Sequence, residues 1–186
     1  MAHRFSELTF TPSVIRVQQH FGTAARVSEV RKRMPEFDVF SSREIEFIQA
    51  RDSFYMATVS ENGWPYIQHR GGETGFIKVL DETSIAFLNY SGNGQYQSQG
   101  NFIAENRVAL FLMSYSQKRR LKLLGRAEMF TAEKLPAELN FFKTEMHTNP
   151  RAESLIRIQM EAFDWNCPQY ITPRYTEAEL AERTGE

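Results

Sequence analysis

Residues 53–71, SFYMATVSENGWPYIQHRG, decide how this chain folds. Residues 53–60 are rich in β-branched and aromatic side chains, and the ENG that follows them is a hairpin turn signal. The return segment begins near Pro65, which has no backbone N–H to donate to a second neighbouring strand. The stretch therefore predicts an antiparallel hairpin whose second strand lies at a sheet edge or has the proline at its beginning.

The sequence before this hairpin predicts a short helix. Ser41 stands three residues before Glu44, which is the spacing of a capping box. Ile45 and Ile48 then follow at helical spacing. We expect a helix over Ser42 to Ala50.

The sequence after the hairpin continues mainly in strands. Strand composition or alternation is found in GFIKVL, TSIAFLN, VALFLMSY, RRLKLLGRAEMF and SLIRIQMEAFDW. Helices are expected over residues 98–105 and 132–145, and a second capping box joins Thr176 to Glu179. Six or seven mostly antiparallel strands with a few short helices indicate a mainly β fold, in which the sheet closes into a barrel.

Composition restricts the class of protein. The 186 residues carry a net charge of -1, which argues against a dedicated nucleic-acid-binding domain. The lone Cys167 cannot form an internal disulfide, and no apolar run reaches the length of a membrane span or of a signal-peptide core. We expect a cytoplasmic protein with no membrane or nucleic-acid partner.

Two parts of the chain are distinguished by their patterns. Residues 1–40 are irregular apart from one helix expected over Ser13 to Phe21. They are interpreted as an arm that packs on the barrel or on a partner subunit. Residues 41–186 hold the strands and form the barrel domain.

The sequence gives little support for a metal site or for a catalytic thiol. The four histidines are scattered, and none has a ligand-type spacing to another histidine, cysteine or carboxylate, so no metal site is expected. Cys167 follows Trp165 and Asn166 without a base nearby in the sequence, which favours a packing role.

The segment YIQHRGGETGFIK, residues 66–78, indicates a ligand. It sets His69, Arg70 and Lys78 beside Gly71 and Gly72. A turn requires the glycines but not the cations, and a solvated surface requires the cations but not the glycines. The combination indicates a backbone that comes close to a flat or anionic ligand.

The segment NYSGNGQYQSQGN, residues 89–101, and the strand RRLKLL could hold an anion. The first is either a polar loop or a phosphate site, because hydroxyl and amide donors come directly before a helix. In the second, Arg120 and Lys122 share one strand face, which is either solvated or directed at a ligand phosphate.

Taken in order, the blocks FYMATVSENGWPYIQHRGG, GFIKVLDETSIAF, GNGQYQSQGN, RVALFLM, RLKLLGRAE and FDWNCPQY resemble the FMN-binding split barrels of the pyridoxamine 5′-phosphate oxidase-like family. The resemblance runs from about Phe47 to about Tyr170. It implies a six-stranded antiparallel split barrel and a homodimer with FMN between the subunits. The flavin ring would lie against YIQHRGG, and the loop and helix after the fourth strand would take the phosphate.

The resemblance and the donor patterns together nominate the cofactor-binding residues. The glycines would let the backbone approach the flavin, and the cations would contact its phosphate or the edge of its ring. The nominated residues are His69, Arg70, Gly71, Gly72, Lys78, Asn89, Asn93, Tyr96, Ser98, Asn101, Arg120, Lys122 and Trp165.

One departure from the family affects the substrate. The true oxidases carry a basic segment for the vitamin B6 phosphate near the C-terminus, where this chain has FDWNCPQYITPRY with Arg174 as its one cation. The expected function is therefore an FMN-dependent oxidoreductase of unassigned substrate, which passes hydride or electrons through flavin N5 from NAD(P)H or a small molecule. A flavin-binding protein without turnover, and a split barrel that handles haem or deazaflavin, remain as alternatives.

Overall fold

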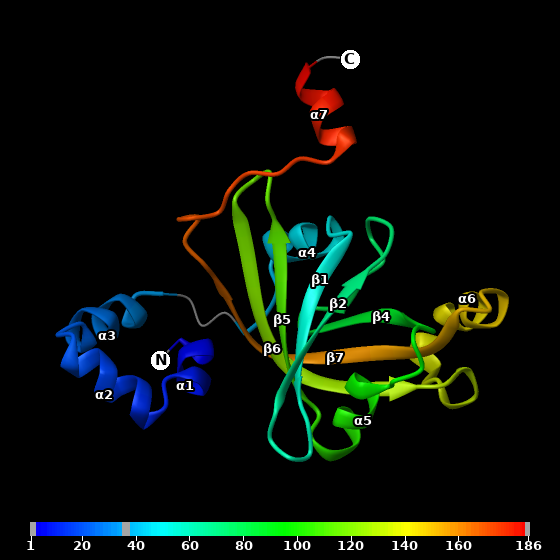
Figure 1. The fold of residues 1–186 in the computed structure, drawn as a ribbon, viewed down its shortest axis with the longest axis horizontal. Coiled ribbons are helices and arrows are strands. Elements are labelled where there is room, and N and C mark those ends of the chain that lie inside the picture. Colours follow the sequence, from blue (N-terminus) through cyan, green and yellow to red (C-terminus); the bar gives the residue numbers. More distant parts are fainter. Residues whose placement is uncertain (1–2, 35–37, 185–186) are drawn as a thin grey trace.

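The computed structural model describes residues 3–34 and 38–184, so parts of the sequence-predicted arm, residues 1–2 and 35–37, lie outside the described residues. The strands form one antiparallel sheet in the order β2-β1-β5-β6-β7-β4-β3 (Figure 1). Their bounds are β1 Ser53–Val59, β2 Pro65–Gly71, β3 Lys78–Asp81, β4 Ser84–Tyr90, β5 Arg107–Ser114, β6 Arg119–Phe130 and β7 Ala152–Trp165.

The expected fold class needs two corrections. The sheet has seven strands, whereas the family resemblance implied six. The six or seven strands expected from the residue patterns include SLIRIQMEAFDW, which forms β7 between β6 and β4. Strands and helices are also more evenly represented than a mainly β class implies, so the fold is mixed α/β.

The hairpin over residues 53–71 is present as predicted. β1 and β2 pair from Ser53 with Gly71 to Val59 with Pro65. β2 has β1 as its neighbour on one side and lies at the end of the sheet order. Pro65 is its first residue, where a missing N–H costs no ladder hydrogen bond.

The long strands bend the sheet so that its ends approach each other. In Figure 1, β4 crosses the view at a steep angle to β1 and β5, and the long strand β6 bends from one direction into the other. The pairing of β6 with β7 shifts register between Leu124 and Gly125. A Cβ at Gly125 would lie 2.5 Å from the backbone oxygen of Gln159, so the bend requires glycine. Phe54 of β1 and Phe87 of β4 then meet inside the barrel, with ring centroids 5.1 Å apart.

Three helical predictions for the barrel domain can be compared with the structure. The helix α4, Ser42–Gln49, begins with the predicted capping box, and α5 spans Gln97–Ala104. The single helix expected over residues 132–145 is wrong. Because Pro136 cannot donate an N–H and restricts Leu135, this region breaks into η1 Ala132–Lys134, η2 Ala137–Phe142 and α6 Lys143–Thr148.

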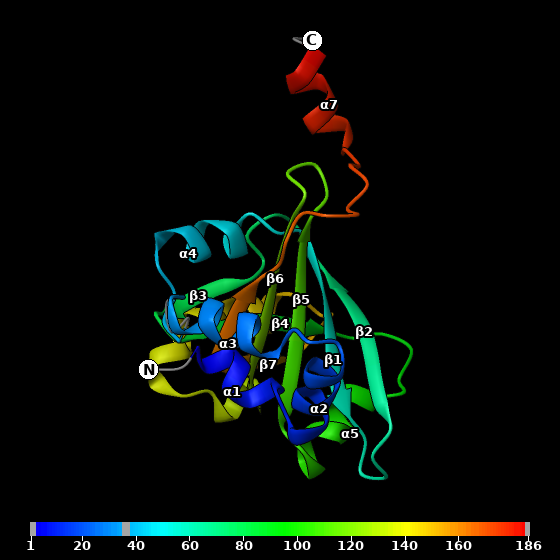
Figure 2. The ribbon, with the colours of Figure 1, turned by 90° about the vertical axis from the view of Figure 1, so that its left-hand side faces the viewer.

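The N-terminal arm is more helical than the sequence indicated. The helix expected over Ser13 to Phe21 is present as α2 Pro12–His20, and α1 Arg4–Thr9 and α3 Ala24–Lys32 are further helices. Phe5 of α1 is buried near β7, whereas α2 and α3 bury no residue and project from the barrel (Figures 1 and 2). Thr11 and Pro12 supply the N-cap and N1 residues of α2. At the other end, α7 spans Glu177–Thr184 after the predicted capping box at Thr176.

Within residues 3–34 and 38–184, no helix has the length and apolar character required to cross a membrane.

Candidate functional site

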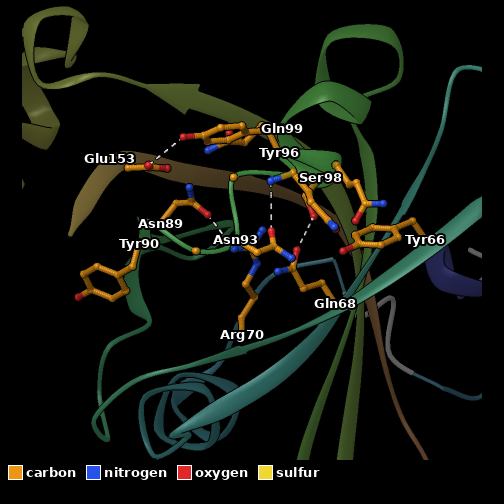
Figure 3. A pocket seen from close by; sticks show the side chains of 14 residues that line it. Tyr66, Gln68, Arg70, Asn89, Tyr90, Asn93, Tyr96, Ser98, Gln99 and Glu153 are labelled. Carbon is orange, nitrogen blue, oxygen red and sulfur yellow. Dashed lines mark hydrogen bonds between the residues drawn. The ribbon is translucent and has the colours of Figure 1, made fainter.

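A polar pocket of about 220 Å³ lies where the two ends of the sheet approach each other (Figure 3). Its walls come from the edge strand β2, the end of β4, the loop that leads into α5, and the start of β7. The lining residues are Tyr66, Gln68, Arg70, Asn89, Tyr90, Gly92, Asn93, Gly94, Gln95, Tyr96, Gln97, Ser98, Gln99 and Glu153.

The alternation of β2 places three of these side chains. Tyr66, Gln68 and Arg70 are half-buried on the pocket face, and the residues between them are exposed on the other face. The Arg70 guanidinium donates from Nη1 to Asn89 Oδ1 over 2.7 Å. Its Nε is buried and has no hydrogen-bond partner among the described residues. Burial lowers the pKa of Arg70, which Tyr66 partly opposes, yet a guanidinium remains charged at neutral pH.

The partner of Arg70 is itself held in position. Asn89 is buried and donates from Nδ2 to Ser154 Oγ on β7 over 3.3 Å. Since Asn89 is fixed from two sides, it orients the guanidinium toward the pocket rather than toward solvent. The Arg70 guanidinium therefore faces the pocket with its Nε donor unused.

The loop after β4 forms the opposite wall. It contains Gly94 at φ 72° and Tyr96 at φ 51°, and this left-handed backbone turns the chain sharply into α5. The Asn93 side chain accepts from the Gln95 N–H over 3.1 Å, and Ser98 Oγ donates to Gln68 Oε1 over 3.1 Å. The loop therefore presents amides and hydroxyls close to the single cation.

The charge of the pocket is balanced by one carboxylate. Glu153 accepts from the Tyr96 hydroxyl over 3.1 Å, and this hydrogen bond raises the pKa of Tyr96 (Figure 3). One guanidinium with neutral donors can bind an anionic group in a directional way.

The structure brings together five of the residues nominated from the sequence: Arg70, Asn89, Asn93, Tyr96 and Ser98. Sequence reasoning missed Tyr66, Gln68 and Glu153. The alternation of β2 was a signal for the first two, because they share the face of Arg70. Glu153 comes from β7, far along the chain, and no local pattern indicated it.

The glycine pair and its neighbours have local explanations in the structure. A Cβ on Gly72 would lie 2.8 Å from the Phe76 ring, and the Gly72 N–H donates to the Asp52 carbonyl over 2.8 Å. On Gly71, a Cβ would lie 3.0 Å from the imidazole of His69. His69 faces away from the pocket and contacts the Tyr55 ring.

The remaining nominated residues do not line the pocket. Lys78 Nζ donates to the Gly75 carbonyl over 2.8 Å, and Asn101 Nδ2 donates to Thr58 Oγ1 over 2.8 Å. Arg120 is half-buried on β6 and its Nε has no hydrogen-bond partner in the described part of the chain.

Trp165 and Lys122 each have a different set of partners. Trp165 Nε1 donates to Glu44 Oε1 over 2.6 Å, and the guanidinium groups of Arg43 and Arg119 lie over its ring. Lys122 Nζ lies 2.9 Å from Asp164 Oδ2 and 4.6 Å from the ring centre of Phe5.

Over residues 3–34 and 38–184, no group of histidine, cysteine or carboxylate side chains could hold a metal ion.

The fold agrees with a family comparison. The pyridoxamine 5′-phosphate oxidase family matches residues 42–165, which is more than half of the chain. The chain belongs to the pyridoxamine 5′-phosphate oxidase-like family. A comparison with curated proteins found no match.

Solved structures give the same fold at low sequence identity. The chain is similar to HupZ from Group A Streptococcus, at 14% identity and a TM-score of 0.54 over 73% of this chain and 100% of that one. A single-residue variant of HupZ is 15% identical, with a TM-score of 0.54 over 68% of this chain and 98% of that one. A candidate pyridoxamine 5′-phosphate oxidase from Lactobacillus delbrueckii is 16% identical, with a TM-score of 0.52 over 68% of this chain and 94% of that one. At these identities the likeness extends to the fold and no further.

Proposed function

We propose that this chain is an FMN-dependent oxidoreductase. We also propose that the pocket at the split, which is the place where the two ends of the sheet approach each other, holds the phosphate end of the flavin. The observation that carries the proposal is the half-buried guanidinium of Arg70, which has an unpartnered Nε beside a loop of neutral donors. A buried donor without a partner is costly, and a phosphate oxygen would satisfy it.

The residues of the pocket fit a phosphate ester. Arg70 supplies the charge, while Asn93 and Gln95 supply side-chain amide groups. Asn89 keeps Arg70 in position through the 2.7 Å hydrogen bond. Glu153 lies at the same pocket but is occupied by the Tyr96 hydroxyl. A bound flavin supplies hydride and electron transfer, and these residues bind and orient its phosphate end.

The size of the pocket favours a site shared between two subunits. Sites that enclose a drug-sized ligand are roughly 300–1,000 Å³, and this one is about 220 Å³. It therefore accommodates the phosphate and ribityl end, and the flat ring system requires a further surface. We propose that a second copy of the chain supplies that surface in a homodimer.

An exposed apolar face on the other side of the β1–β2 hairpin from the pocket supports the homodimer. Tyr55 and Val59 of β1 and Ile67 of β2 lie on the face of the hairpin opposite to Arg70, and they are 39%, 39% and 64% exposed. Trp64, in the turn of the same hairpin, is 73% exposed. Contiguous apolar surface of this kind is typical of an interaction site.

The vitamin B6 reaction is not part of the proposal. Arg174, the one cation of its segment, lies over the Tyr115 ring at 5.0 Å and does not line the pocket. NAD(P)H or another small reductant is the proposed substrate class.

The visible spectrum of the purified protein tests the cofactor. We expect flavin absorption, release of FMN rather than FAD on denaturation, and tighter binding of FMN than of riboflavin. Arg70→Met should remove most of that preference, with Lys78→Met as a matched control on a cation outside the pocket. A haem spectrum, a deazaflavin spectrum, or a colourless protein that does not take up FMN would each contradict the proposal.

Anaerobic reduction separates an enzyme from a binding protein. We expect bleaching of the flavin by NADH or NADPH, followed by turnover when an acceptor is added. FMN that binds stoichiometrically but is reduced by neither nucleotide nor by other small reductants would support a flavin-binding protein without turnover.

A further inference from the structure

A second cavity, of about 650 Å³, lies between the N-terminal arm and the barrel. Its walls come from α1 and α3 of the arm and from β6 and β7 of the sheet. It shares no lining residue with the pocket at the split. Its volume lies within the range of roughly 300–1,000 Å³ that is usual for small-molecule sites. The lining residues are His3, Phe5, Ser6, Thr9, Phe10, Arg26, Val27, Val30, Arg31, Met34, Lys122 and Asp164.

Most of the wall is apolar. Phe5 and Phe10 stand on the α1 side, and Val27, Val30 and Met34 stand on the α3 side. Val30 is 53% exposed, so this part of the wall is open to solvent. An exposed apolar concavity with a few polar groups is the usual form of a ligand site.

The charged groups of this cavity are mainly cations. Arg26, Arg31 and Lys122 face a single carboxylate, Asp164, which lies 2.9 Å from Lys122 Nζ. Burial lowers the pKa of His3 and so disfavours a charge on this imidazole, while Asp164 partly opposes the shift. The cavity therefore has an excess of positive charge that its own side chains do not balance.

Arg31 provides the second observation that points to a ligand. Its guanidinium lies over the Phe10 ring, 3.0 Å from the ring centre, which fixes its plane. Its Nη2 is buried and has no hydrogen-bond partner in the described residues. A planar guanidinium with unused donors matches the two oxygens of a carboxylate.

We propose that this cavity binds a carboxylate that carries an apolar chain or ring, such as a medium-chain fatty acid or an aromatic acid. The head group binds Arg31 and Arg26, and the apolar body lies against Phe5, Phe10 and Val30. The site is independent of the flavin and is built mainly by the arm, which lies outside the residues that define the family match.

Isothermal titration of the whole chain with decanoate, below its micelle concentration, tests the proposal. We expect one saturable site, no comparable binding of decanol or decylammonium, and the same result with and without FMN. Arg31→Met should weaken decanoate binding by about tenfold or more, whereas Arg33→Met, an exposed arm cation outside the cavity, should leave it unchanged.

A second variant keeps the test decisive if Arg31→Met folds poorly. Val27→Trp fills the cavity without altering a charge and should abolish decanoate binding, while the flavin spectrum is retained. Equal effects of Arg31→Met and Arg33→Met, or binding of decanol as tight as that of decanoate, would overturn the proposal. So would a wild-type dimer that binds no decanoate but becomes monomeric with Val27→Trp, because a second copy would then fill the cavity.

Discussion

Arg70 of β2 donates a hydrogen bond to Asn89 of β4 over 2.7 Å, although four strands separate β2 from β4 in the sheet order. The bond therefore spans the split, where the two ends of the curved sheet come together. An anion that binds the free donor of Arg70 would therefore bind a residue pair that joins both ends of the sheet.

The first prediction concerns Asn89→Asp. A carboxylate at this position would form an ion pair with Arg70 and compete with a bound phosphate. We expect FMN affinity to fall roughly ten- to a hundredfold, because a charge-assisted hydrogen bond is worth about 1.5–3 kcal/mol, and riboflavin affinity to change little. Flavin titrations measure both, with the exposed hairpin variant Asn62→Asp as the control. Equal losses of affinity for FMN and for riboflavin would show that Arg70 does not bind the phosphate.

The second prediction concerns Gly72→Ala. The new methyl group would lie 2.8 Å from the Phe76 ring, so Phe76 has to move out of the core that it helps to cover. We expect a loss of about 1–3 kcal/mol in the free energy of unfolding, measured by urea denaturation. Gly92→Ala, where a Cβ meets nothing within 4 Å, should leave stability unchanged or slightly raised. Unaltered stability of Gly72→Ala would mean that Phe76 repacks freely.

The third prediction is a pH dependence from Glu44. Burial raises the pKa of Glu44, but hydrogen bonds from Ser41 and Trp165 outweigh burial and leave the pKa below its ordinary value of 4.5. A lowered folded-state pKa contributes stability that is present above 4.5 and lost as the pH falls through the folded-state value.

Glu44→Gln tests this dependence, since glutamine keeps the shape but not the charge. At pH 7 wild type should be more stable than the variant by about 1 kcal/mol. This difference should shrink as the pH falls below 4.5 and through the folded-state pKa of Glu44. Denaturation followed by tryptophan fluorescence measures the difference at each pH. A difference that stays constant from neutral to acid pH would show that the charge of Glu44 contributes nothing.

The fourth prediction tests the proposed dimer. Ile67→Glu places a charge on the exposed apolar face of the β1–β2 hairpin, where Ile67 is 64% exposed. We expect light scattering to give a monomer for this variant and a dimer for wild type, with weaker FMN binding in the monomer. Phe141→Glu, at a position 62% exposed outside the hairpin, is the matched control and should remain dimeric. A monomeric wild type with bound flavin would contradict the shared site.

Local patterns predict the strands of the barrel, and the reason lies in particular residues. The turn after Ser60 and the proline at the start of β2 act within a few residues, and the capping box of Ser41 and Glu44 is equally local. Pro136 is an equally local signal for the break in the helix expected over residues 132–145, although the composition around it favours a continuous helix. Two helices of the arm, α1 and α3, were missed. α3 buries none of its residues, which leaves a weak periodic signal.

The site was only half predictable for a related reason. Donors in the loop after β4 are contiguous in sequence, so Asn89, Asn93 and Ser98 can be grouped from the sequence alone. Lys122 shows the limit of this reasoning. Its strand was predicted, but its partners Asp164 and Phe5 come from distant parts of the chain, and they direct it to the cavity beneath the arm.

The pairing of β4 with β7 also determines the order in which the protein can form on the ribosome. β4 is buried along almost its whole length, and Ile85 pairs with Ile158, which is synthesised much later. Until β7 emerges, the β3–β4 hairpin has an apolar surface and an unpaired edge exposed to other nascent chains. Pairings so distant in sequence form slowly and leave such edges open to aggregation. Low growth temperature or chaperone co-expression should therefore raise the yield of folded protein more than any change to the mature surface.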